Sequence, residues 1–116
     1  MRVINRTAVT LVGREPYQEW ARGRDADFTK NMLTVARTRT HGTCVLLPEF
    51  DLEEDLLEWV EENHAWLFEV QLAAWTEDES AWPNTRGVKM FREWFLVESH
   101  NTVVDASDEE IEGEAL

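Results

Sequence analysis

The chain of 116 residues contains a single cysteine and no long run of apolar residues. With Cys44 alone, no internal disulfide bond can form, which agrees with a reducing compartment. A transmembrane helix needs roughly 18 or more consecutive apolar residues, and no stretch reaches that length. The first residues also lack the apolar core and cleavage site of a signal peptide. We therefore expect a cytoplasmic protein without a membrane-spanning segment.

Glycine is scarce, and basic residues are missing from the middle of the chain. The five glycines are isolated from one another, so no glycine-rich loop can cradle a phosphate. Residues 40–85 contain twelve acidic residues and no lysine or arginine, whereas residues 1–39 have eight basic and four acidic residues. The net charge of −13 argues against direct binding to nucleic acid or to an anionic membrane.

The sequence also lacks the common signatures of catalysis. It has no zinc-protease, EF-hand or paired-cysteine motif. Cys44 lies in the apolar run TCVLL, where a free cysteine is typical of a buried core. His41 would be about 10 Å from Cys44 along an extended strand, too far for a direct pair. We therefore expect no catalytic residue and no cofactor.

One arrangement could present metal ligands. Glu98 and His100 are two residues apart in a predicted strand, so their side chains lie on the same face. His64 or Glu61 would have to supply a third ligand through a tertiary contact. The alternative interpretation is that Glu98 and His100 form a solvent-exposed pair on a sheet.

The hydrophobic pattern predicts strands separated by helices. Residues 43–50 are a continuous apolar run closed by proline, which is typical of a central strand. The predicted strands are 7–13, 43–50 and 95–106. The predicted helices are 14–23, 25–37 (on the weakest pattern), 51–75 and 84–95.

The clearest predicted element is a long acidic helix over residues 51–75. Asp51 and Glu54 have the spacing of an N-terminal capping arrangement. An apolar stripe follows at helical spacing, and glutamates occupy the opposite side. Asn63 and His64 interrupt the stripe, so we expect a bend or break there.

These elements favour a single α+β domain over residues 1–105. A small, mainly antiparallel sheet of about three strands would be packed against the long acidic amphipathic helix and the shorter helices. The tail, residues 106–116, is rich in acids and poor in apolar side chains, and we expect it to be disordered.

Tryptophan is abundant, with six residues against one tyrosine. In WTEDESAWP (75–83), two tryptophans bracket three consecutive acids. Thr76 and Glu79 match a capping box, so the simplest interpretation is a helix start. Because aromatic anchors within a polar rim favour protein contacts, we also take Trp75, Glu79, Trp82 and Arg86 as the candidate binding residues.

The segments VLLPEFD and WTEDESAWPNTRGVKMFREWF, with the acidic helix between them, resemble small acidic bacterial proteins that are usually labelled hypothetical. The resemblance covers most of the chain apart from the final strand and tail. It implies a cytoplasmic bacterial protein of unassigned function, and it carries no active-site residues.

Three functions remain open on the sequence alone. The first is a protein-interaction or adaptor module, binding a protein partner or forming a homodimer in which Arg86, Lys89 and Arg92 pair with acids of a second subunit. The second is an acidic mimic of nucleic acid that occupies the groove of a basic protein. The third is a small metal-dependent or acid/base enzyme. High salt would release a mimic but largely spare an aromatic-anchored complex.

Overall fold

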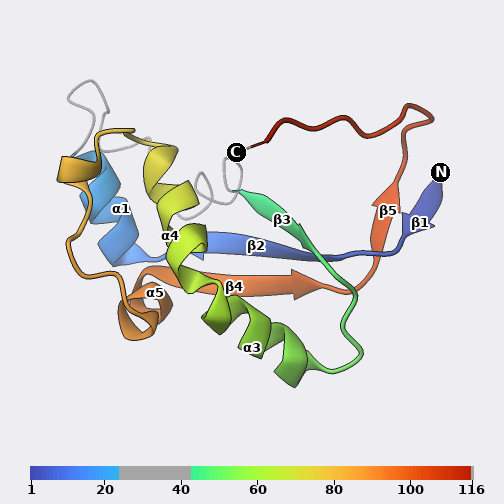
Figure 1. The fold of residues 1–116 in the computed structure, drawn as a ribbon, viewed down its shortest axis with the longest axis horizontal. Helices are drawn as coiled ribbons and strands as arrows, with labels where there is room; N and C mark the ends of the chain where they lie inside the picture. Colours follow the sequence, from blue (N-terminus) through green and yellow to red (C-terminus); the bar gives the residue numbers. More distant parts are fainter. Residues whose placement is uncertain (24–42, 116) are drawn as a thin grey trace.

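The computed structural model describes residues 1–23 and 43–115 (Figure 1). This part of the chain is a single α+β domain, as the sequence predicts, but it has two antiparallel sheets instead of the one expected. The larger sheet has the strand order β3-β2-β4, and the smaller sheet pairs β1 with β5. The strands are β1 (Arg2–Ile4), β2 (Thr7–Gly13), β3 (Cys44–Leu47), β4 (Phe95–His100) and β5 (Val103–Asp105). The helix predicted at 25–37 and His41 lie outside the described residues.

The two sheets are successive parts of one long ribbon. Ala8 pairs with His100 and Ile4 with Val103, so residues 5–7 on one arm lie opposite residues 101–102 on the other. One extra residue on one arm is the feature of a β-bulge, which bends a ribbon and increases its twist. The continuous strand predicted at 95–106 is therefore wrong, because it divides between two sheets at residues 101–102.

The helices cover one face of the three-stranded sheet (Figure 1). They are α1 (Glu15–Arg22), α3 (Glu53–Glu62), α4 (His64–Ala73) and α5 (Val88–Trp94), with a short 3-10 helix, η1 (Glu79–Ala81). Residues that pair across antiparallel strands share a face, so Val9 and Leu11 of β2 point to the same side as Val45 and Val97. That side forms the core with Phe68 and other apolar side chains of α3 and α4.

The predicted long helix is two shorter helices. Asn63, with φ −108° and ψ 12°, ends α3 and precedes α4. The side chain of Asn63 donates to the carbonyl of Trp59 at 2.8 Å, a local bond that competes with a regular helix. The cap predicted at Asp51 is also wrong, because α3 begins at Glu53 after Leu52 and has no side-chain cap. The acids of its first turn still suit the helix dipole.

The position of β3 corrects two further predictions. β3 is an edge strand of the larger sheet, and β2 is the central one. Strand alternation turns Val45 and Leu47 toward the core and Cys44 and Leu46 away from it. Cys44 is therefore exposed rather than buried.

Two features concern the limits of the domain. Among the described residues, no helix has both the length and the apolar character needed to cross a membrane. Residues 106–115 form no helix or strand, and local turns at Ser107 and Glu109 follow β5. The predicted disorder of this tail stays a prediction.

Candidate functional site

The predicted binding residues lie in the segment that connects α4 to α5. The indole N–H of Trp75 donates to the hydroxyl of Tyr17 at 2.7 Å, and that of Trp82 donates to the carbonyl of Thr76 at 3.0 Å. Both side chains are half-buried and pack against the core. Trp20 of α1 adds a third such bond, to the carbonyl of Ala81 at 3.1 Å. These indoles therefore hold the segment onto the domain.

The structure brings the side chains of Trp82 and Arg86 together, whereas Glu79 meets Trp82 through its backbone carbonyl, which accepts from the Trp82 backbone N–H at 3.1 Å. The Arg86 guanidinium lies 5.7 Å from the centroid of the Trp82 ring, a cation–π contact. It also pairs with Glu69 of α4 at 3.3 Å and donates to the carbonyl of Pro83 at 2.8 Å. Glu79 is exposed at the start of η1. Arg86, one of the three basic residues expected to face a partner, is thus already engaged within the chain.

The predicted capping box at Thr76 is wrong. The hydroxyl of Thr76 accepts from the backbone N–H of Asp78 at 3.1 Å, and Asp78 caps the short η1 instead. The Asp78 carboxylate accepts from the hydroxyl of Ser80 at 2.6 Å and from its N–H at 3.1 Å. These bonds from Ser80 hold the pKa of Asp78 below its usual range. The acids of this segment form turns, with no α-helix.

The sheet separates two of the candidate metal ligands, Glu98 and His100, from the other two, His64 and Glu61. Glu98 pairs with Thr10 and His100 with Ala8, which places both on the face opposite the core helices. His64 belongs to α4, where its Nδ1 lies 2.7 Å from the carbonyl of Glu61, and the Glu61 carboxylate pairs with Arg92. Within residues 1–23 and 43–115, no three His, Cys, Asp or Glu side chains gather as metal ligands.

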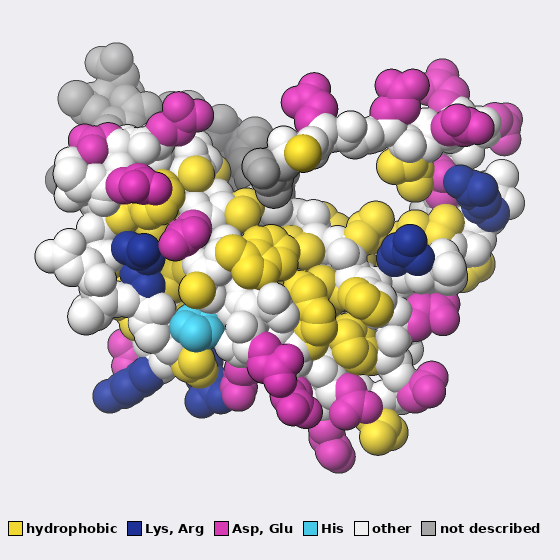
Figure 2. Space-filling view, in the orientation of Figure 1, with side chains coloured by type: hydrophobic (Ala, Val, Ile, Leu, Met, Phe, Trp, Pro, Cys, Tyr) yellow, Lys and Arg dark blue, Asp and Glu magenta, His cyan; other side chains and the backbone are white. Residues whose placement is uncertain are grey.

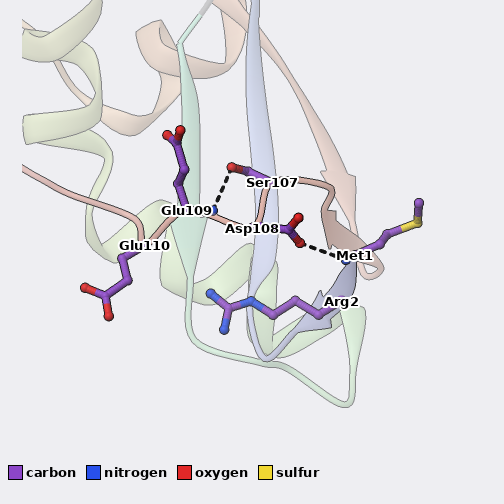
Figure 3. A pocket seen from close by; sticks show the side chains of 6 residues that line it. All are labelled: Met1, Arg2, Ser107, Asp108, Glu109 and Glu110. Carbon is purple, nitrogen blue, oxygen red and sulfur yellow. Dashed lines mark hydrogen bonds and ion pairs between the residues drawn. The ribbon is translucent and has the colours of Figure 1, made fainter.

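A shallow hollow lies between the first residues and the tail (Figure 3). Its volume is about 260 Å³. Its lining residues are Met1, Arg2, Ser107, Asp108, Glu109 and Glu110. The Met1 amine lies 3.9 Å from an Asp108 oxygen, and the Glu109 N–H donates to the Ser107 hydroxyl at 3.0 Å. Because all of these side chains are solvent-exposed, the hollow offers no desolvated group for catalysis.

A second aromatic surface, absent from the sequence prediction, lies on α3 and α4. The rings of Trp59 and Trp66 meet edge to face, with centroids 6.1 Å apart and planes at 90°. Trp66 is 39% exposed, and Leu52, which directly precedes α3, is 57% exposed. We call Leu52, Trp59 and Trp66 the Trp59–Trp66 stripe. Figure 2 shows hydrophobic side chains gathered over the middle of this face.

Carboxylates border the stripe along α3 (Figure 2). The exposed acids of this helix are Glu53, Glu54, Asp55, Glu58, Glu61 and Glu62. Among the described residues, only Glu61 of this set has a cationic partner, Arg92 of α5. An exposed tryptophan that packs on a half-buried one, beside uncompensated carboxylates, is a surface suited to a positively charged partner.

The sequence does contain a signal for the stripe. Residues 52, 59 and 66 repeat at intervals of seven, a spacing that would place them on one side of an uninterrupted helix. The sequence prediction instead favours Trp75 and Trp82, because three consecutive acids lie between them. The indole N–H of Trp59 has no acceptor among the described residues, which distinguishes it from Trp75 and Trp82.

The chain matches no protein-family model, and comparisons with curated proteins and with solved structures find no match. The resemblance to small acidic bacterial proteins therefore stays a prediction.

Proposed function

We propose that this chain is a protein-binding module that recognises a basic partner through the Trp59–Trp66 stripe. The observation that carries the proposal is the perpendicular tryptophan pair, with Trp66 exposed and Trp59 half-buried, beside carboxylates of α3 that mostly have no cationic partner in the described chain. Exposed aromatic anchors are frequent energetic centres of interfaces. The carboxylate rim would steer a cationic surface toward them and repel an acidic one.

The charges favour a different protein over a second copy of this chain. The homodimer predicted from the sequence needs Arg86, Lys89 and Arg92 to reach acids of another subunit. In the structure Arg86 and Arg92 pair with Glu69 and Glu61 of their own chain, which leaves the exposed Lys89 as the one member of this set without an ion pair in the described residues. Two copies meeting at their stripes would also bring two acidic α3 helices together. The proposal keeps a cytoplasmic location, with which the free Cys44 is compatible.

The test compares three immobilised proteins in nuclease-treated lysate, eluted in steps of rising salt. These are the wild type, Trp66→Ala and Leu96→Ala. Leu96 is a matched control because it is 38% exposed and lies on the sheet face opposite the core helices. We expect a basic protein that the wild type and Leu96→Ala retain and that Trp66→Ala loses. The captured protein is then purified and titrated against all three.

Two results would contradict the proposal. Equal capture by Trp66→Ala and the wild type would remove the stripe from the interface. Release of many basic nucleic-acid-binding proteins at moderate salt, regardless of Trp66, would favour the acidic mimic, whose attraction is mostly screened electrostatics.

A further inference from the structure

Asn63 uses its side chain in an unusual way for its position. It is the N-cap residue of α4, where an asparagine oxygen normally accepts from a backbone N–H of the first turn. Here no such capping bond forms. The Oδ1 of Asn63 instead accepts from the indole N–H of Trp66 at 3.0 Å. The amide group of Asn63 donates to the carbonyl of Trp59. One side chain therefore bonds to the indole ring of Trp66 and to the backbone of Trp59.

This arrangement fixes the orientation of an exposed side chain. An exposed tryptophan on a helix is ordinarily free to change rotamer, and ordering it on binding costs free energy. The bond from Asn63 removes part of that freedom before a partner arrives. The capping oxygen thus orders the Trp66 ring rather than the helix end.

Glu62 lies between Trp59 and Trp66 in the sequence and adds a negative charge there. It follows Trp59 by three residues on α3, a spacing at which helical side chains meet, and it directly precedes Asn63 at the bend. Glu62 is exposed and has no ion pair in the described part of the chain. Aromatic faces with an adjacent carboxylate attract a cation. A purely apolar anchor on the partner would gain nothing from such a carboxylate.

We propose that the Trp59–Trp66 stripe binds an arginine or lysine side chain of the partner, with Glu62 pairing its charge and Asn63 acting as a positioning residue for Trp66. This inference rests on the proposed function, because it names the group by which the basic partner is recognised. Arginine is the better fit, since its planar guanidinium stacks on aromatic rings and pairs with a carboxylate at its edge.

The test uses arginine amide as the probe. The control is citrulline amide, which has the same α-amine but an uncharged isostere of the arginine side chain. Indole ¹H–¹⁵N resonances of the full chain are followed during titration and assigned with Trp59→Phe and Trp66→Phe. We expect arginine amide, but not citrulline amide, to shift the Trp59 and Trp66 signals. Glu62→Gln should weaken this binding about two- to fivefold, the size of one exposed cation–π or ion-pair contact. Glu79→Gln is the matched control, and its affinity for arginine amide should equal that of the wild type.

The positioning role is tested with Asn63→Ala and Asn63→Asp. Asn63→Asp keeps an acceptor for the indole, so the Trp66 resonance should stay close to its wild-type position. Asn63→Ala should move that resonance toward the position of a solvated indole and weaken arginine amide binding. Circular dichroism checks that both variants keep their helices. Unchanged arginine amide binding by a folded Asn63→Ala would overturn this role.

Failure of this inference can be told apart from failure of the proposed function. If arginine amide and citrulline amide shift the two resonances equally, or shift neither, recognition of a cation is wrong. The proposed function would still stand if Trp66→Ala loses the basic partner while Leu96→Ala retains it. If all three proteins retain the partner, the proposed function itself is wrong.

Discussion

Single side chains of Trp and Tyr connect distant parts of this chain through hydrogen bonds. The Tyr17 hydroxyl on α1 donates to the carbonyl of Gln71 at 2.8 Å and accepts from the indole of Trp75. The phenol ring also contacts Phe95 of β4, with centroids 4.8 Å apart. One residue thus joins α1, α4 and the sheet, and aromatic amphipathic side chains serve such roles because they combine large apolar area with a polar end.

We predict that Tyr17→Phe destabilises the fold by about 1–3 kcal/mol. The change keeps the ring but removes the hydroxyl that donates to the buried Gln71 carbonyl, and the loss of such a buried hydrogen bond costs this much. Urea unfolding followed by tryptophan fluorescence measures the difference. A loss below about 0.5 kcal/mol would show that the Gln71 carbonyl finds another partner.

The burial of the Tyr17 phenol leads us to predict that the fold loses stability at high pH. Burial raises the pKa of the Tyr17 phenol above its ordinary value of about 10, and the bond from Trp75 only partly opposes this. Above that ordinary value the unfolded chain releases the proton while the folded chain keeps it, so stability is full below it and falls as pH rises further.

Absorbance measures this directly, because Tyr17 is the only tyrosine in the chain. As the pH is raised, phenolate absorbance should appear only together with unfolding, which circular dichroism follows. Phenolate formation in a fully folded protein near pH 10 would contradict the burial argument.

At the scale of elements, close approach decides where β2 ends and α1 begins. A Cβ placed on Gly13 would lie 2.4 Å from Cδ1 of the Tyr17 ring. The backbone of Gly13 is not in the left-handed region, so space rather than conformation requires glycine here. The absence of a side chain lets the Tyr17 ring lie on the end of the strand.

We therefore predict that Gly13→Ala destabilises the fold by about 1–3 kcal/mol, as overpacking of a core does. Gly113→Ala is the control, because a Cβ placed there would have no atom within 4 Å, and the change should stay within about 0.5 kcal/mol. The urea midpoints of the two variants give the comparison. An unchanged midpoint for Gly13→Ala would mean that the Tyr17 ring moves aside freely.

At the scale of the whole molecule, acidic charge is in large excess. The net charge is −13, and most acids of α3 have no cationic partner among the described residues. Repulsion between such charges destabilises the compact state and is screened by salt. The ion pairs that Arg86 and Arg92 make with α4 and α3 are at least partly exposed, so each contributes little.

We predict that sodium chloride raises the urea midpoint of unfolding, because screened repulsion outweighs the few screened ion pairs. Glu58→Gln/Glu62→Gln should show a smaller rise, since these two like charges are four residues apart on α3. A midpoint that falls with salt would show that native ion pairs dominate the electrostatics of the fold.

Features that depend on neighbouring residues could be predicted from the amino-acid sequence. The apolar character of β2, the α1 helix with proline in its first turn and the break near Asn63 follow from local pattern and turn chemistry. The acidic middle of the chain is likewise a matter of composition. These predictions hold because periodicity and local hydrogen bonding act over a few residues.

Strand order, the exposure of Cys44 and the choice of tryptophans that face solvent depend instead on tertiary contacts. The sequence predicts Trp75 and Trp82 as surface binding residues because acids lie between them. In the structure, the Tyr17 hydroxyl and the Thr76 carbonyl accept hydrogen bonds from their indoles and hold them against the domain. Trp66, inside an apolar run, is the more exposed. A tryptophan can satisfy its apolar ring and its N–H in either place, so contacts between residues far apart in the chain determine its position.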